Sequence, residues 1–168
     1  GQVLQTEDLE NGLKVISIHD PSQPIATIEI AVRHGAFAES PQYDGLSHLY
    51  EHMFFKGNET IPDQEAYLER MKELGIVFNG TTSTERVNYF FTLPSSNLRE
   101  GLEFMEQAIR SPKFNDEEFQ KEKKIVLSEY DRAESEPRYA FRRAMQRKQW
   151  WKYPSRKITL GSRKAIST

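Results

Sequence analysis

The chain has 168 residues, with 23 Lys and Arg against 25 Asp and Glu, a formal net charge of −2 and no cysteine. This length suits one domain with a sizeable core, and 10 Phe, 7 Tyr and 2 Trp exclude a chain that is disordered throughout. The balanced charge gives no sign of a surface for nucleic acid or an anionic membrane. The lack of cysteine excludes a disulfide scaffold and a thiolate metal site. No apolar run is long enough to cross a bilayer.

The first part of the chain predicts β-strands. Residues 4–9 and 13–19 flank Asn11-Gly12, a strong hairpin signal because both residue types tolerate a positive φ. Residues 25–33 alternate apolar and polar side chains, as a half-buried strand does. Three strands in succession predict an antiparallel meander.

Helices dominate the rest of the chain, with glycine at the ends of the first two and Ser, Asn or Asp at the starts of later ones. The predicted elements are helices 46–56 and 62–74, strands 76–80 and 86–93, and helices 96–110, 116–135 and 138–152. This order predicts an α+β fold, an antiparallel β-sheet covered by helices, in a single domain over residues 1–168. No closing element is predicted for residues 157–168, so we expect the domain to be truncated in this chain.

Two histidines on helix 46–56 form a candidate metal site. His48 and His52 are four residues apart, a rotation of about 400° and a rise of about 6 Å, so their imidazoles leave the same face. Imidazole is a common ligand of Zn²⁺. Glu51 lies beside them, in the H-x-x-E-H order that inverts the H-E-x-x-H zinc motif. The alternative is a pair of surface histidines, a pattern that chance produces roughly once in 100 such chains.

A catalytic zinc needs a third protein ligand, and helix 116–135 offers two carboxylates. Its apolar stripe includes Ile125 and Val126, and Glu122 and Glu129 fall in the arc between them. A carboxylate that points into a core is costly unless it is paired or bound to a cation. On this pattern alone, a metal site and a buried ion pair with Lys or Arg remain open.

The segment from His48 to Gly57 resembles the signature of the insulinase/pitrilysin metallopeptidases. In that family the third zinc ligand is a glutamate on a later helix, and the 76 residues 53–128 separate His52 from Glu129 here. Glu122 matches a supporting acid one heptad earlier. Gly35 and Glu39 match the usual Gly and Glu before the zinc helix.

The resemblance implies a zinc-dependent endopeptidase domain of the insulinase and processing-peptidase type (LuxS/metallohydrolase-like), similar to the processing-peptidase-like bacterial members. It implies one Zn²⁺ per domain, with His48, His52 and Glu129 as ligands. Glu51 would be the general base, and Glu122 would orient a ligand imidazole from behind.

The resemblance also implies the partners of the site. Residues 78–82 resemble the family's edge strand, so Asn79, Gly80 and Thr81 would hold an extended peptide substrate. A second homologous half or subunit would close the chamber, so the isolated chain should hydrolyse peptides poorly or not at all. The alternative is a non-catalytic scaffold or partner subunit of the same family. The bacterial envelope is the favoured compartment, with the cytoplasm as the runner-up.

Other polar residues have simpler interpretations. His19 and His34 are expected to be solvated. The basic segment 138–152, with Trp150-Trp151 near its end, predicts an amphipathic helix with a solvated face rather than a nucleic-acid surface. We therefore expect no nucleic-acid partner and no membrane-spanning segment.

Overall fold

The N-terminal hairpin forms a small sheet of its own in the computed structural model, which describes residues 3–152 and 157–167. Strands β1 (Val3–Asp8) and β2 (Lys14–His19) pair antiparallel around a turn in which Gly12 has a φ of +83°. The Asn11 side chain accepts a hydrogen bond from the Leu13 amide (3.1 Å). The hairpin prediction is confirmed.

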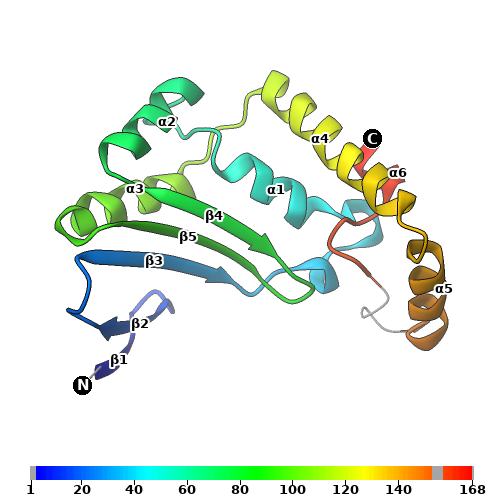
Figure 1. Cartoon of the computed structure of the whole chain (residues 1–168), viewed down its shortest axis with the longest axis horizontal. Coiled ribbons are helices and arrows are strands. Elements are labelled where there is room, and N and C mark those ends of the chain that lie inside the picture. The colour runs from blue at the N-terminus through cyan, green and yellow to red at the C-terminus, as the bar shows by residue number, and fades with distance from the viewer. Residues whose placement is uncertain (1–2, 153–156, 168) are drawn as a thin grey trace.

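The main sheet has three antiparallel strands in the order β3-β5-β4: β3 (Ile25–Val32), β5 (Val87–Pro94) and β4 (Val77–Thr82) (Figure 1). The predicted meander is therefore wrong at its third strand, because β3 pairs with β5 and not with β2. The reason is burial. Strand β5 is the most buried strand and takes the central position, where both of its edges are paired.

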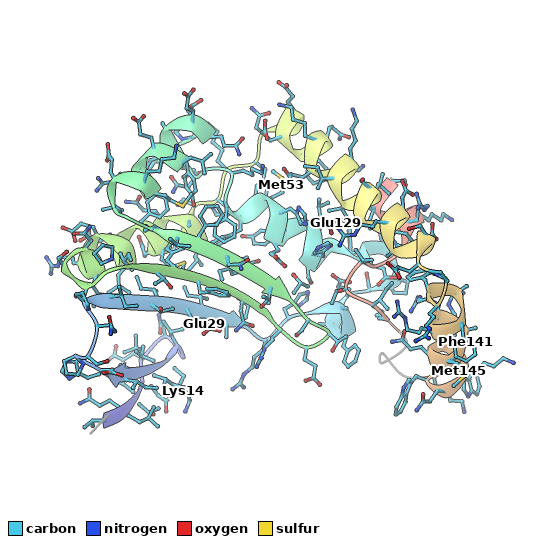
Figure 2. The ribbon with its side chains drawn as sticks, viewed as in Figure 1. Lys14, Glu29, Met53, Glu129, Phe141 and Met145 are labelled. Carbon is cyan, nitrogen blue, oxygen red and sulfur yellow. The ribbon has the colours of Figure 1, made fainter. Side chains whose placement is uncertain are left out.

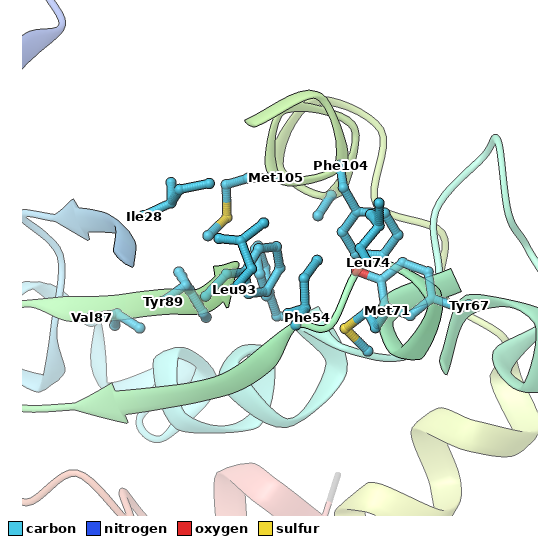
Figure 3. Close-up of a cluster of buried hydrophobic side chains, with 13 residues drawn as sticks. Ile28, Phe54, Tyr67, Met71, Leu74, Val87, Tyr89, Leu93, Phe104 and Met105 are labelled. Atoms are coloured by element: carbon cyan, nitrogen blue, oxygen red, sulfur yellow. The ribbon is translucent and has the colours of Figure 1, made fainter. Parts of the chain in front are cut away.

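One face of this sheet is covered by helices α1 (Leu46–Phe54), α2 (Gln64–Glu73) and α3 (Leu98–Arg110). Their apolar side chains gather with those of the strands in one core (Figure 3). Its buried residues are Ile28, Phe54, Tyr67, Met71, Leu74, Ile76, Val87, Tyr89, Phe91, Leu93, Phe104, Met105 and Ala108. Antiparallel pairing puts directly opposite residues on the same face, so Ile30, Tyr89 and Gly80 all point toward these helices.

The second half of the chain contains α4 (Asp116–Ser135), α5 (Tyr139–Gln149) and α6 (Arg163–Ser167), and a smaller core forms between α1, α4 and α6. Leu49 of α1, Val126 and Tyr130 of α4 and Ile166 of α6 form its buried cluster. Helix α4 lies along α1 (Figure 1).

Two predictions for this half are wrong. Ile125 is 46 % exposed and outside the apolar stripe, because only one narrow face of α4 contacts α1 and α6. Helix α6 lies in a segment for which no closing element was predicted. It is tied to α4 by ion pairs of Arg163 with Asp131 and Glu134.

The short 3₁₀ turns Ala36–Ala38, Pro41–Tyr43 and Ser95–Asn97 complete the described secondary structure. None of the described helices combines the length and apolarity that a membrane crossing requires. The α+β prediction, with an antiparallel sheet covered by helices, is confirmed.

Candidate metal centre

Helix α1 carries both histidines on the side that faces α4. The Nε2 atoms of His48 and His52 are 3.3 Å apart, with the two rings perpendicular to each other. The helical spacing predicted from the sequence thus brings the two imidazole nitrogens to one point.

The start of α1 is fixed by an acid from the preceding loop. Gly45 enters the helix with a φ of +108°. The buried carboxylate of Glu39 accepts hydrogen bonds from the amides of Gly45 (2.8 Å) and Ser47 (2.7 Å). A negative charge is favourable at a helix N-terminus because of the unpaired amides and the helix dipole. Glu39 therefore determines where α1 begins, and the start of the helix in turn determines the position of His48.

Gly35 joins this loop to the turn between β4 and β5. A Cβ at this position would lie 2.5 Å from the carbonyl oxygen of Ser83 and 2.7 Å from the amide nitrogen of Arg86. The amide of Phe37 also donates to the carbonyl oxygen of Thr84 (2.8 Å). Only glycine fits so close to another backbone, so the approach to α1 is anchored on the sheet.

Glu129 lies on helix α4 (Figure 2), and its carboxylate is close to both histidines. Its Oε2 atom lies 3.5 Å from His48 Nε2, and its Oε1 atom lies 3.7 Å from His52 Nε2. One ligand atom from each of the three residues lies within 4.8 Å of the other two.

These separations fit a tetrahedral cation. Zinc bonds of 2.0–2.2 Å to nitrogen and oxygen imply tetrahedral edges of about 3.3–3.6 Å, close to the 3.3 and 3.5 Å between donor atoms here. Two imidazoles and one carboxylate are also a donor set that zinc accepts. The residues present therefore fit a zinc ion.

Glu122 stands behind the candidate ligands and is nearly fully buried. Its Oε2 atom lies 3.0 Å from His52 Nδ1, and its Oε1 atom lies 2.6 Å from Lys56 Nζ. Of the two interpretations left open by the sequence, the structure shows the buried ion pair at Glu122, and the same carboxylate also contacts His52 of the candidate metal site. When Nδ1 donates to Glu122, the lone pair of His52 Nε2 faces the other donors.

The environment of His48 favours its neutral form. Burial, and to a lesser extent the charge of His52, lower the pKa of His48 below its usual value, against the opposing effect of Glu129 and other acids. Neutral imidazole is the form that binds a metal.

Glu51 points from α1 toward strand β4. The Thr82 hydroxyl donates a hydrogen bond to Glu51 Oε2, and Gly80 lies directly beneath the Glu51 side chain. Within the described residues β4 pairs with β5 alone, so its other edge is unpaired. Asn79 and Thr81 point to the opposite, uncovered face by the alternation of the strand, and Asn79 Oδ1 accepts from the Gly80 amide (2.8 Å).

The structure thus brings His48, His52, Glu122 and Glu129 together and puts Glu51 beside them against the edge strand. His19 and His34 are exposed and lie outside this group. The sequence reasoning did not find the contacts made by Lys56 and Thr82. Lys56 lies in the segment from His48 to Gly57 that resembles the family signature, and Thr82 is the last residue of the predicted edge strand 78–82. Neither sequence pattern indicates which side chain these residues contact.

Comparisons with known proteins identify the family of the chain. A family model described as Insulinase (Peptidase family M16) matches residues 14–163. Human insulin-degrading enzyme is 31 % identical over 125 residues, which are 74 % of this chain and 12 % of that protein. An uncharacterized zinc protease of Rickettsia bellii is 28 % identical over 160 residues, which are 95 % of this chain and 39 % of that protein.

The fold also matches a solved structure. The crystal structure of a protease from Helicobacter pylori superimposes with a TM-score of 0.88 at 23 % identity, covering 99 % of this chain and 40 % of that chain. The chain therefore spans between about an eighth and two fifths of the length of these relatives.

Proposed function

The chain belongs to the insulinase family of peptidases, peptidase family M16, and on this premise we propose that it is the zinc-bearing part of a metalloendopeptidase. Family membership and the zinc proteases among its relatives support a peptidase function. The observation that carries the finer proposal is the convergence of His48, His52 and Glu129 at distances that suit zinc.

In this proposal His48, His52 and Glu129 hold one Zn²⁺. When bound there, zinc supplies a Lewis acid that polarises a peptide carbonyl and lowers the pKa of water from 15.7 toward about 7. Glu122 accepts a hydrogen bond from His52 Nδ1 and keeps that imidazole in the orientation in which Nε2 points to the donors. Lys56 balances the charge of the buried Glu122.

Glu51 acts as the general base and then as the general acid. Its carboxylate accepts a proton from the attacking water and delivers it to the nitrogen of the leaving amine. This proton transfer is worth about 10²–10⁴-fold in rate.

Strand β4 binds the substrate as an added strand. Its unpaired edge offers main-chain hydrogen bonds to an extended peptide, so affinity depends little on the peptide sequence. Asn79, Gly80 and Thr81 lie at the middle of this edge, with Gly80 next to Glu51. A second homologous half or subunit completes the chamber, in keeping with the greater length of the relatives.

The test is the substitution Glu51→Gln in the zinc-loaded protein with the second half or subunit that completes the chamber, and Glu69→Gln on the exposed side of α2 is the matched control. Turnover of a fluorogenic peptide should fall by about 10²–10⁴-fold while zinc content stays the same. The control should behave as the unchanged protein. With the second half or subunit present, an unchanged rate after Glu51→Gln, or no hydrolysis before substitution, would support the alternative of a non-catalytic scaffold.

A further inference from the structure

Glu51 is held against strand β4 at two points. Thr82 Oγ1 donates a hydrogen bond to Glu51 Oε2. A Cβ added at Gly80 would lie 2.8 Å from Glu51 Cγ and 3.1 Å from Glu51 Oε1. The bare backbone of Gly80 therefore gives the acid the space to reach the strand, and the hydroxyl two residues later binds it there.

The register of the sheet explains why these two residues face Glu51. Gly80 is opposite Tyr89 and Thr82 is opposite Val87, so both point to the face that α1 covers. On the same face the ring of Tyr89 stacks on Phe54 of α1, with centroids 3.9 Å apart. Helix α1 and strand β4 lie side by side in Figure 1.

Thr82 is itself firmly placed. It is the last residue of β4 before the turn to β5, in which the Ser83 amide donates to the Arg86 carbonyl (2.8 Å) and the Ser83 hydroxyl donates to the same oxygen (2.9 Å). As a β-branched residue it also has few rotamers. The Thr82 hydroxyl is therefore a well-positioned donor, and it can hold the longer side chain of Glu51 in one orientation.

We propose that Thr82 is a positioning residue for Glu51, an inference that rests on the proposed function. Within the described residues, Thr82 is the one side chain hydrogen-bonded to the Glu51 carboxylate. Occupying Oε2 fixes the rotation of the carboxyl group and leaves Oε1 as the oxygen that exchanges protons. The strand that receives the peptide therefore also aims the base at it.

This role is distinguishable from ligand binding and from substrate binding. Thr82 does not touch His48, His52 or Glu129 by any hydrogen bond in the described structure, so its loss should leave zinc affinity unchanged. Its side chain points to the α1 face and not along the open edge, so the Michaelis constant should also stay the same. The effect should appear in kcat, at about the 10–100-fold that loss of a supporting hydrogen bond causes at such sites.

The experiment compares Thr82→Val, Thr82→Ser and Thr27→Val in the zinc-loaded protein with the second half or subunit that completes the chamber. Thr27 is a matched control because its hydroxyl also makes a hydrogen bond within the sheet, to Thr92 (3.0 Å), on the opposite face. Thr82→Val should lower kcat by about 10–100-fold with unchanged KM and zinc content, whereas Thr82→Ser, which keeps the hydroxyl, and Thr27→Val should retain kcat.

A second measurement needs no zinc and no substrate. In the metal-free protein, Thr82→Val should lower the melting temperature in the original background but not in a Glu51→Ala background, where the acceptor is already gone. The inference is overturned if Thr82→Val keeps full kcat, if Thr82→Ser is impaired as strongly as Thr82→Val, or if the melting shift is the same in both backgrounds. When Glu51→Gln lowers turnover as expected and Thr82→Val leaves kcat unchanged, this inference fails alone. When Glu51→Gln has no effect, the proposed function fails with it.

Discussion

The substitution Glu39→Gln tests whether one buried carboxylate sets the start of helix α1, which carries His48 and His52. Glu39 is 7 % exposed and accepts two backbone hydrogen bonds, from Gly45 and Ser47. The amide of Gln has almost the same shape but one acceptor oxygen, so one of these amides loses its partner and faces an NH₂ group.

The magnitude follows from the contact that is lost. A hydrogen bond to a charged group contributes about 1.5–3 kcal/mol, so Glu39→Gln should destabilise the fold by this amount. For a domain of this size each kcal/mol corresponds to about 2–4 °C, which gives a fall in melting temperature of about 3–12 °C. Glu39→Ala removes both bonds and should cost about twice as much.

The assay is thermal unfolding of the metal-free protein, followed by circular dichroism. Glu106→Gln is the control, because Glu106 is exposed and its ion pair with Arg110 (3.0 Å) lies on the surface, where such pairs contribute at most about 1 kcal/mol. Equal melting temperatures for Glu39→Gln and the control would refute the reasoning and remove Glu39 from the start of α1.

Two further substitutions test the metal centre and the core. If Glu129 is a direct ligand, as proposed, Glu129→Gln should lower zinc affinity by more than the roughly 10–100-fold caused by losing a supporting residue; unchanged zinc content by elemental analysis would exclude Glu129 from the ligand set. Phe104→Ala should cost about 3–5 kcal/mol, because its side chain is 3 % exposed in the main core, and should lower the melting temperature by about 6–20 °C. Phe141→Ala, at a position that is 67 % exposed (Figure 2), should change stability by less than about 0.5 kcal/mol, and equal losses for the two would contradict the core assignment.

Local structure could be predicted from the sequence because its signals are local. The Asn11-Gly12 turn, the alternation of residues 25–33 and the Asn115 cap each involve a few neighbouring residues. In the structure Asn115 Oδ1 accepts from the Glu117 amide (2.8 Å) at the start of α4. The positions of His48 and His52 follow from helical periodicity alone, which is why their convergence needed no knowledge of the fold.

Pairing between distant segments could not be predicted in the same way. The pairing of β3 with β5 depends on which strand buries the most apolar surface, and no signal near residue 25 contains that information. Helix α6 has only five residues, too few for a periodic pattern, and its position depends on Arg163 reaching α4.

The candidate site shows the same division. The inward direction of Glu122 could be inferred from the helix pattern, but its partners could not, since Lys56 and Glu122 are far apart in sequence and meet only when α4 lies along α1. The contact between Thr82 and Glu51 likewise requires the observed register of β4 on β5. A shift of the register by one residue would turn the Thr82 side chain to the opposite face of the sheet.

The unpaired edge of β4 carries a risk of pairing with other chains, and residues outside this strand must prevent it. Exposed edges are usually guarded by charged residues or proline, which discourage pairing with other chains. Strand β4 has neither in its sequence VFNGTT, and Val77 is 71 % exposed. An edge that binds extended chains through their backbones, as proposed for β4, does not distinguish a foreign peptide from the β4 of another copy. Selectivity for one peptide over another must therefore come from the surroundings that limit access to the edge. The same unpaired edge could also pair with other copies of the chain, so covering it should reduce self-association.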